Sequence, residues 1–526
     1  FSGEPFADFL LGLPETTQRY TSAVPVFQRR FSELGFFFQD DSKASSRLTL
    51  NLGIRYDYIS PRREINGAYM NFNPVDGSLV FPDEKSISMV HPAFPTSIKR
   101  VTAAQAGFPS MLMNGTNSIS PRIGFAYRLT DNPSTVLRGS YGIFTANAGW
   151  KNNNFATLQS GAFALTETFT NVITNGVPLV TLDHPFPSTI GAGPSTVSVG
   201  GNSPNLGIPY LQQWNLTLER QIYGDWAVHV SYVGAKNTQL SYRHNINQPR
   251  ASLTPFDPSR LIYPGYLTIT YAEPGGNSSY PAMQFGFNHR LSSGLMVEGL
   301  FQWINEITDV GEDGIDVWLG PTIENAYCRS CERGKGLGDS LDFRTNLVYE
   351  IPFGKGRPFG SSVRPVVNGF IGGWSIGAIV DARNGRPATV LYSGVDASNT
   401  NLFGGRASYV AGCDPRTGDG KSAPYLNINC FAVPAAGTFG NVGTTPFRKP
   451  GSYDVSGSIY KYFPLWREGV RLRVNGVFTN AFNHPTWNDV GNNITVPATF
   501  GKFVSQQSFG RWVGSRTINL QAQIQW

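Results

Sequence analysis

Two short stretches of the sequence match motifs that enzymes use. Residues 373–377 read GWSIG and fit the Gly-x-Ser-x-Gly pattern, in which a serine nucleophile lies on a strained turn between a strand and a helix. Residues 378–381 continue this stretch as a strand and provide no helix. Residues 420–422 end like a phosphate-binding loop, but Pro415 stands where such a loop requires its first glycine. We therefore predict no catalytic residue and no enzymatic activity.

Acidic residues crowd one stretch of the chain around Gly311 and Gly314. They are Asp309, Glu312, Asp313 and Asp316. Oxygen-rich loops of this kind can bind calcium, although the spacing of an EF-hand is not met, and a solvated acidic loop is the other interpretation. The histidines are too scattered for a transition-metal site; they are His91, His184, His229, His244, His289 and His484. The sequence predicts no cofactor, and calcium is its one metal candidate.

Four cysteines fall into two stretches without a strand pattern. Cys328 and Cys331 lie in one, and Cys413 and Cys430 lie in the other. Disulfides suit an oxidising compartment, and closing the second loop would stabilise it by roughly 3 kcal/mol, which is useful to a loop with little core of its own. A four-cysteine zinc site and redox chemistry are the alternatives, but there is one Cys-x-x-Cys pair and no thioredoxin-like pattern around it. The pairing stays open.

The elements that position these residues are strands with one apolar and one polar face. From Leu48 to Tyr58 every second side chain is apolar, and residues 517–526 repeat the pattern and end on Trp526. Most of the thirteen predicted strands are close to the ~9 to 11 residues of a tilted membrane strand. They lie near residues 36–41, 47–58, 121–129, 136–144, 213–222, 226–234, 281–291, 295–304, 342–351, 373–382, 453–463, 470–480 and 514–526.

The links between the predicted strands alternate between short turns and long irregular stretches. This is typical of an outer-membrane barrel, which has short periplasmic turns and long extracellular loops. The last strand follows a long link, so we expect the C-terminus to be periplasmic. Since bacterial barrels have an even number of strands, further strands are expected, either around residues 155–170 or 266–271 or ahead of Phe1, where neither a methionine nor a signal segment is visible.

Composition excludes several other classes of protein. Charged residues make up 15% of the chain, and its 58 glycines and 36 prolines would break long helices. No apolar run reaches the ~18 residues of a membrane helix, and 13% aromatic residues argue against disorder. The net charge of +6 is spread along the chain, so nucleic acid is not an expected partner. The fold class is therefore all-β, a large transmembrane antiparallel β-barrel.

Several short segments, taken in their order, resemble TonB-dependent outer-membrane receptors, most closely the Oar-like branch. The resemblance covers nearly the whole chain, so we assign residues 1–526 to the barrel domain of such a receptor. The segments are 36–41 (FFFQDD), 48–57 (LTLNLGIRYD), 120–127 (SPRIGFAY), 349–354 (YEIPFG), 372–374 (GGW), 439–441 (FGN) and 480–485 (NAFNHP), together with the terminal Trp526.

The resemblance implies a C-terminal fragment of a barrel with about 22 strands. A signal peptide, a regulatory β domain, a TonB box and a plug would precede it, and none of them is visible in the sequence. The implied function is uptake of an unidentified extracellular ligand across the outer membrane, energised by the TonB complex. Further implied partners are membrane lipid, lipopolysaccharide and the barrel-assembly machinery, the last through the C-terminal strand with Ile518, Leu520, Ile524 and Trp526.

Two alternatives share parts of this pattern. A passive outer-membrane channel would have the same barrel without a plug. A secreted β-rich binding or hydrolytic protein would turn its polar faces to water and its apolar faces to a packed core. In the barrel interpretation, aromatic residues form girdles at the membrane interfaces; these are Phe36, Phe37, Phe38, Tyr56, Tyr58, Trp214, Trp226, Trp303, Trp374 and Trp526.

Overall fold

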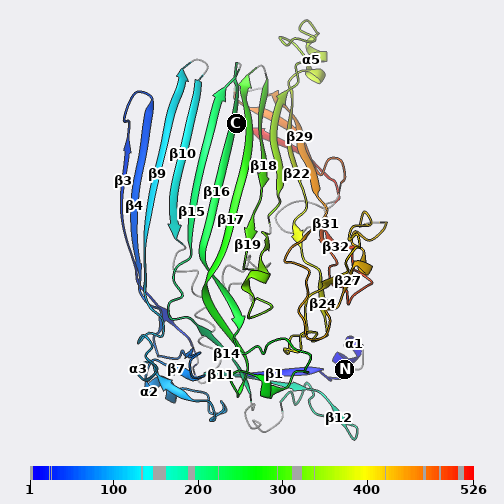
Figure 1. The fold of residues 1–526 in the computed structure, drawn as a ribbon. Coiled ribbons are helices and arrows are strands. Elements are labelled where there is room, and N and C mark those ends of the chain that lie inside the picture. Colours follow the sequence, from blue (N-terminus) through cyan, green and yellow to red (C-terminus); the bar gives the residue numbers. More distant parts are fainter. Residues whose placement is uncertain are drawn as a thin grey trace.

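The dominant feature of the molecule is a long, curved antiparallel sheet. The computed structural model describes residues 4–22, 24, 26–131, 134–145, 162–186, 196–222, 224–292, 294–310, 323–336, 338–420, 422–465, 469–484, 487–506 and 515–526. The largest sheet has 16 strands; three of them, β14, β19 and β20, lie off its main path, which therefore runs through thirteen strands (Figure 1). Each of the thirteen strands predicted from the sequence corresponds to one strand of this path.

These thirteen strands form what we call the wall. In order across the sheet they are β3 (Glu33–Ser42), β4 (Leu48–Ile59), β9 (Thr116–Asp131), β10 (Ser134–Thr145), β15 (Tyr210–Gln221), β16 (Trp226–Asn245), β17 (Tyr266–Ser292), β18 (Leu295–Ile304), β21 (Leu341–Glu350), β22 (Trp374–Arg383), β29 (Ser452–Pro464), β30 (Arg471–Thr479) and β33 (Thr517–Gln525). Every neighbouring pair along this path is antiparallel.

The register of the wall separates its side chains into two faces. On one face, Leu52 of β4 lies beside Ile123 of β9, and Ile123 lies beside Tyr141 of β10. One residue further along each strand, Asn51 lies beside Gly124 on the other face. Because side chains alternate along a strand, the whole sheet keeps this division. We call the side with Leu52 the outer face and the side with Asn51 the inner face.

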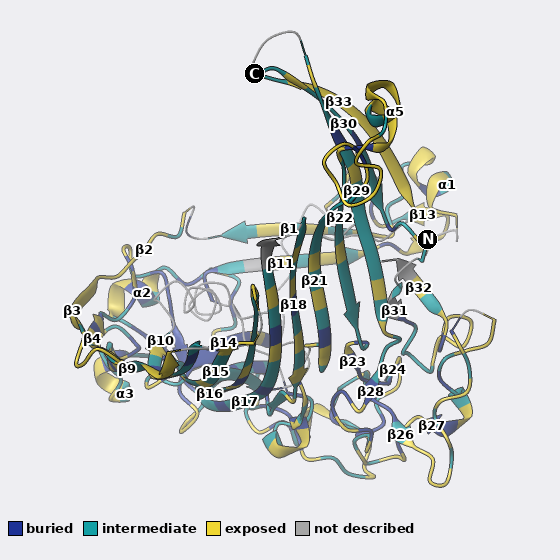
Figure 2. Cartoon of the chain, turned by 90° about the horizontal axis from the view of Figure 1, so that it is seen from above, coloured by how far each residue is buried: buried dark blue, intermediate teal, exposed yellow. Residues whose placement is uncertain are grey.

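The described wall is an open sheet and not a closed barrel. Its edge strands β3 and β33 each pair with one neighbour, β4 and β30, and not with one another. Seen from above, the strands follow an arc that leaves one side open (Figure 2). The all-β, antiparallel class predicted from the sequence is confirmed, whereas the described strands do not show the closure that the barrel prediction includes.

The two ends of the wall differ in their connections, as the alternation of links predicts. Short turns join the strands at one end, and the long connections gather at the other end (Figure 1). Gln525 pairs with Arg471, which follows the short link after β29, so the C-terminus lies at the short-turn end. The extra strand considered at residues 266–271 is the beginning of β17. In residues 155–170, β11 (Ala164–Thr170) pairs with β1 (Thr16–Ser22) away from the wall, and residues 155–161 lie outside the described part.

The described parts of the long connections are packed, and the expectation that the loop with Cys413 and Cys430 has little core of its own is wrong. Those on one side of the molecule pack around a cluster that includes Phe72, Leu79, Phe163 and Ile269, all fully buried. We call this unit the first cap. Its elements are α2 (Glu84–Ser88), α3 (Ala103–Ala106), η2 (Pro258–Arg260), β2 (Arg29–Arg30), β5 (Arg63–Glu64), β6 (Asn71–Phe72), β7 (Leu79–Phe81), β8 (Arg100–Thr102) and β14 (Val197–Asn202).

A smaller unit, the second cap, forms from residues 384–451 and 487–506. Val390, Cys430, Phe431 and Phe500 belong to its buried cluster. Its elements are β23 (Pro387–Ala388), β24 (Leu391–Ser393), β25 (Gly404–Arg406), β26 (Ser408–Tyr409), η4 (Ile428–Cys430), β27 (Phe431–Ala432), β28 (Phe447–Arg448), β31 (Trp487–Val490) and β32 (Phe503–Gln506). The long connections therefore form packed units because segments distant in sequence share a core.

The remaining elements are short. They are α1 (Pro5–Leu10), β12 (Ile173–Thr174), β13 (Val177–Pro178), β19 (Ile307–Thr308), η3 (Arg329–Glu332), β20 (Gly334–Lys335) and α5 (Pro365–Ile371). Within the described ranges, no helix has both the length and the apolar character needed to cross a membrane.

Candidate functional site

The enzyme-like motifs lie in a strand and in a loop. Residues 374–377 begin β22, which runs without interruption from Trp374 to Arg383, so no turn and helix follow Ser375 as a nucleophile elbow requires. Gly420 lies in the second cap with a φ of +77°, and Lys421 lies outside the described residues. The strand predicted at the first motif is confirmed.

The inner face of the wall is polar and carries both signs of charge. Asp57 forms an ion pair with Arg55 at 2.6 Å. Further along the same face, in β21, Arg344 and Asp342 lie 2.6 Å apart. In the neighbouring strand β22, Arg383 lies 2.5 Å from Asp381. These groups are close enough to pair within the wall, so they line its concave side without creating a field of one sign. Such a surface suits a hydrated or protein-filled lumen.

Glycines hollow out the inner face near its β3 edge. Gly53, Gly124 and Gly142 come from three adjacent strands and line one cavity of about 400 Å³. Gly53 also lines a second cavity of about 400 Å³. The Arg122 guanidinium lies between these cavities and stands 4.7 Å from the centre of the Phe144 ring. Glycine within a strand leaves room for another backbone or a ligand to approach closely. The missing side chains leave a trough on the inner face of the wall.

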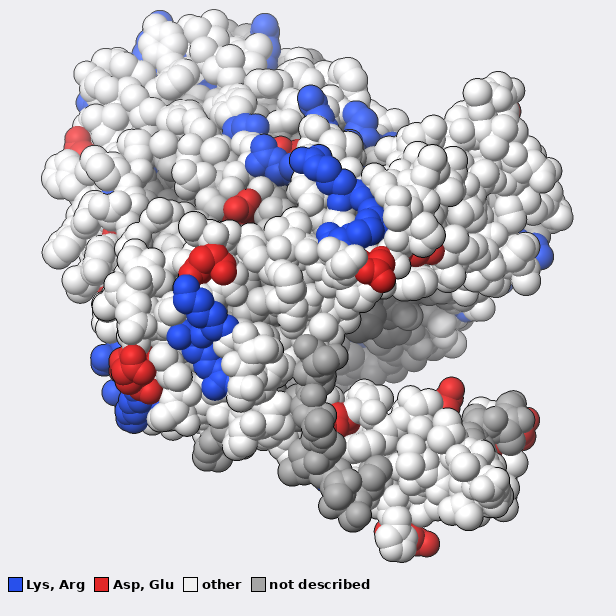
Figure 3. Space-filling view, turned by 60° about the horizontal axis from the view of Figure 1, so that its bottom comes forward, with Lys and Arg blue, Asp and Glu red and all other residues white. Residues whose placement is uncertain are grey.

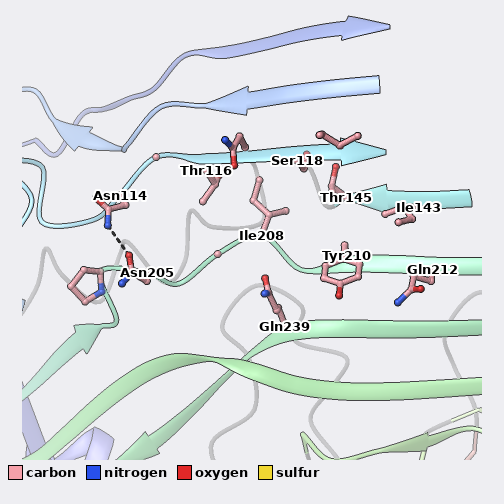
Figure 4. A pocket seen from close by; sticks show the side chains of 15 residues that line it. Asn114, Thr116, Ser118, Ile143, Thr145, Asn205, Ile208, Tyr210, Gln212 and Gln239 are labelled. Atoms are coloured by element: carbon pink, nitrogen blue, oxygen red, sulfur yellow. Dashed lines mark hydrogen bonds between the residues drawn. The ribbon is translucent and has the colours of Figure 1, made fainter. Parts of the chain in front are cut away.

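A larger pocket of about 510 Å³ lies at the cap end of the wall. It opens where the pairing of β9 with β10 stops at Arg122 and Gly142, beside the first residues of β15 (Figure 4). We call it the rim pocket. Its lining residues are Asn114, Gly115, Thr116, Asn117, Ser118, Ile119, Ile143, Thr145, Pro204, Asn205, Gly207, Ile208, Tyr210, Gln212 and Gln239.

The rim pocket has an uncharged, hydrogen-bonding lining. Asn114 donates to the side-chain oxygen of Asn205 at 2.7 Å, and Gln212 accepts a hydrogen bond from Tyr141 at 2.9 Å. The Ser118 hydroxyl is buried and has no hydrogen-bond partner in the described part of the chain. Amides and hydroxyls can bind neutral polar groups, and a pocket without charged side chains offers no counter-charge to an ion.

The register places much of this pocket on the outer face. Thr145 pairs with Tyr210 and Ile143 pairs with Gln212, in line with the outer-face pair of Tyr141 and Trp214. The outer face thus changes from apolar to polar towards the caps. Such a change is expected where a membrane wall leaves the hydrocarbon core and enters the headgroup region.

A buried ion cluster joins two long connections, the one between β18 and β21 and the one between β22 and β29. Arg406 of the second cap lies 2.6 Å from Glu332 and 3.1 Å from Glu324. All three side chains are about nine-tenths buried. Burial raises the pKa of Glu324 above its usual value, and Arg406 acts against this rise. We call this cluster the loop clamp. Arg406 is more than 70 positions from either glutamate, so no periodic signal in the sequence points to the cluster.

The structure pairs the four cysteines within their own connections. Cys328 is bonded to Cys331, and Cys413 is bonded to Cys430. The first disulfide closes the turn directly before Glu332 of the loop clamp, and the second lies against the core of the second cap. Both disulfides therefore belong to the architecture of the long connections.

The calcium candidate is only partly within the described residues. The Asp309 carboxylate accepts the backbone N–H of Asn277 at 2.6 Å and lies 3.8 Å from Arg329. Glu312, Asp313 and Asp316 are outside the described part. Elsewhere in the described chain, no group of three histidine, cysteine or acidic residues is placed to hold a metal ion. Calcium binding in this loop stays a prediction.

The C-terminal strand and the aromatic residues occupy defined faces. Ile518, Leu520 and Ile524 lie on the outer face of β33, and Trp526 is almost fully exposed beyond the strand. Aromatic residues expected in girdles also lie on this face, with one exception: Phe37 pairs with Arg55 and points to the inner face. The three consecutive residues of the FFF segment cannot share one face because a strand alternates.

The cap end of the molecule is largely uncharged. In Figure 3, where this end comes forward, basic and acidic side chains stand among a wide area of other residues. The visible basic side chains form short runs, and acidic side chains lie near them (Figure 3).

Comparison with known proteins places the chain among outer-membrane proteins. Residues 1–518 match the family described as "Outer membrane beta barrel domain". No curated protein sequence is significantly similar. Solved structures that match most of this chain include the siderophore receptor PiuA from Acinetobacter baumannii, the copper transporter OprC and the outer membrane transporter YddB from Escherichia coli, with identities of 8%, 12% and 9% and TM-scores of 0.42, 0.41 and 0.42. They cover 94%, 93% and 94% of this chain, which spans only 43%, 47% and 54% of theirs.

Proposed function

Because this chain belongs to the outer membrane beta barrel domain family, we propose that it is the barrel wall of a TonB-dependent receptor of the Oar-like type. Such a receptor takes up a ligand across the outer membrane. The observation that carries the proposal is the two-faced wall, apolar outside and polar inside, with large caps at one end only. Membership of this family also argues against the secreted soluble protein considered from the sequence.

The alternation of short and long connections supports one orientation of the wall in the membrane. Outer-membrane barrels have short periplasmic turns and long extracellular loops. The caps then lie outside the cell, and α5 and the C-terminus lie in the periplasm. An epitope inserted at Gly412 of the second cap should be detected on intact cells. A matched insertion at Gly356 of the short-turn end should be detected only after the outer membrane is opened; both glycines are exposed and have open space around them. The reverse result would overturn the orientation.

The inner face is the part of the wall that a plug would contact. It offers paired charges, amides and the glycine trough, all of which can meet a polar domain or water. An energised receptor uses such a domain to close the lumen until TonB acts on it. In this proposal the caps capture the ligand, and the C-terminal strand with Ile518, Leu520, Ile524 and Trp526 serves recognition by the barrel-assembly machinery.

Ion conductance separates an energised receptor from a passive channel. The full-length protein should be purified and inserted into planar bilayers in potassium chloride, and its binding to the periplasmic domain of TonB should be measured in parallel. A plugged receptor should give no steady conductance and should bind TonB. A steady conductance without TonB binding would replace the uptake proposal with a passive channel, while leaving the outer-membrane wall unchanged.

A further inference from the structure

One short-turn connection is much larger than the others. Residues 351–373 join β21 to β22 and contain α5, which projects beyond the strand ends (Figure 1). We call this connection the foot. Pro365 begins the helix, and the Asn368 side chain accepts the backbone N–H of Lys355 at 2.6 Å, so the two halves of the foot are tied together.

The foot is fixed to the outer face of the wall. Lys461 of β29 and Trp374 of β22 are paired on this face. The Lys461 ammonium donates to the carbonyl oxygen of Gly369 at 2.6 Å, and the Trp374 indole donates to that of Phe370 at 2.7 Å. Lys461 is only 5% exposed. A cation at the C-terminal carbonyls of a helix is favourable, and here it holds α5 on the side of the wall away from the lumen.

The foot exposes the apolar side of its helix. Val366 and Phe370, which lie one helical turn apart, are 74% and 77% exposed. Phe353, Phe359 and Val367 are also exposed. This surface continues the apolar outer face beyond Trp374. An apolar patch of this kind marks a site of contact with a membrane or a partner.

The charge of the foot is of one sign. It contains Lys355, Arg357 and Arg364 and no acidic residue. Arg357 pairs with Glu350 of β21 at 2.8 Å, whereas Lys355 and Arg364 have exposed side chains. Basic residues beside an apolar helix face are the pattern of segments that lie in the interface of a membrane with anionic lipids.

The geometry points to the foot as a binding surface for anionic phospholipid. Val366 and Phe370 enter the acyl boundary of the leaflet next to the short-turn end, and Lys355 and Arg364 contact phosphate groups. Lys461 and Trp374 set the depth of α5 by fixing its last turn to the wall. This inference needs the outer face to contact lipid, as the family implies, and it does not depend on TonB-driven uptake.

A fluorescent label at Val366 tests the proposal in the full-length protein. All cysteines in the described structure are in disulfides, so Val366→Cys can be labelled selectively with an environment-sensitive dye. Ser361→Cys, in the exposed and polar part of the same foot, is the matched control. Both proteins are reconstituted in phosphatidylcholine vesicles, with or without phosphatidylglycerol. Dye emission and quenching by nitroxide-labelled lipid and by aqueous iodide are then measured.

The label at position 366 should show a blue shift and be quenched by the nitroxide lipid, and the label at position 361 should be quenched by iodide. Phosphatidylglycerol should raise the ratio of lipid-bound to lipid-free label at position 366 about fivefold for each basic residue that contacts it. Lys355→Glu and Arg364→Glu should remove this shift and keep the quenching in pure phosphatidylcholine. A change of gel mobility on boiling shows that each variant is folded.

Two results would overturn the proposal. If iodide quenches the label at position 366 as strongly as that at position 361, the apolar face is in water. If neither quencher reaches position 366, the foot packs against protein and its occupant is a partner. Neither result would alter the conductance or the TonB binding expected of an energised receptor, so the two proposals fail independently.

Discussion

Apolar side chains point outward in the wall and inward in the first cap. Leu216 in the middle of β15 is 50% exposed, whereas Leu79 in β7 is completely buried. The two regions are built from one chain and are continuous along β17. The outer face of the wall meets hydrocarbon, so its polar groups turn away from that face. The cap meets water, so its apolar groups are buried. Burial alone therefore says nothing of stability in this molecule until the surrounding solvent is named.

The strongest test of this contrast removes a large side chain from each region. Phe72 is fully buried in the first cap and packs edge-on against Tyr263 and Tyr266, with ring centres 5.0 and 5.4 Å away. Phe72→Ala should lower the unfolding free energy of the cap by about 3–5 kcal/mol. Protease cleavage of the cap and amide hydrogen exchange measure the loss.

Leu216→Ala is the matched wall variant, since lipid can replace the lost contacts. It should leave the mobility difference between boiled and unboiled protein unchanged. Equal losses from both variants would mean that the outer face packs against protein and not against lipid.

A charge on the wall sharpens the contrast in the opposite direction. Leu216→Arg places a cation on the outer face and should destabilise the inserted protein by about 2–4 kcal/mol if the residue lies near the middle of the membrane. Asn215→Arg, one residue away on the inner face, should have little effect. Urea unfolding in lipid vesicles provides the measurement. An Asn215 variant as unstable as the Leu216 variant would show that the two faces are assigned wrongly.

The disulfides test how far the second cap depends on its cross-link. Cys413 and Cys430 are 17 positions apart, whereas Cys328 and Cys331 are three apart. Replacing Cys413 and Cys430 by alanine should destabilise the second cap by about 3 kcal/mol, because a longer loop is freed in the unfolded state. Replacing Cys328 and Cys331 by alanine should cause a smaller loss of stability. Each loss should appear as faster proteolysis of the connection that carries the disulfide, with the wall still resistant. A wall that unfolds with the cap would show that the two regions are one cooperative unit.

The smallest expected effect is a pH dependence of the first cap. Lys99 holds the pKa of the Asp76 carboxyl at about 2, below its ordinary value of 3.8, with help from Ser78. Because the folded-state pKa is lowered, this contribution to stability is present above pH 4 and is lost as the pH falls towards 2. The pair is exposed to solvent, so it is worth less than about 1 kcal/mol.

Asp76→Asn should remove this part of the acid sensitivity, as measured by hydrogen exchange of the cap at several pH values. A variant as acid-sensitive as the parent protein would assign the effect to other carboxylates.

The wall could be predicted from the sequence because its signal is local. Residues 295–304 were predicted as a strand, and β18 has the same bounds. β16 was predicted to end at residue 234 but continues to Asn245, because its ladder with β17 runs on into the first cap. Alternation finds the membrane part of such a strand and misses the part that loses its two-faced pattern.

The caps and the loop clamp were missed for a physical reason. Phe72, Phe163 and Tyr266 meet in one core although nearly two hundred positions separate the first from the last. Arg406 pairs with Glu332, which lies 74 positions earlier in the chain. No period of two or of 3.6 residues links such partners, so their segments look irregular in the sequence. The foot contains one short helix, and this helix is held by Lys461. The pairing of β22 with β29 brings Lys461 to the foot, and the sequence pattern does not reveal this pairing.

The composition of the first cap has a consequence for the time course of assembly. Phe72 comes from the connection between β4 and β9, Phe163 from that between β10 and β15, and Tyr266 from the start of β17. Each hairpin therefore delivers one piece of the cap, and the last piece arrives only with β17. Contacts this distant form late, since the loops between them must close first. Until β17 is in place, the earlier pieces have no complete core, so the cap should become protease-resistant as the final event on this side of the molecule.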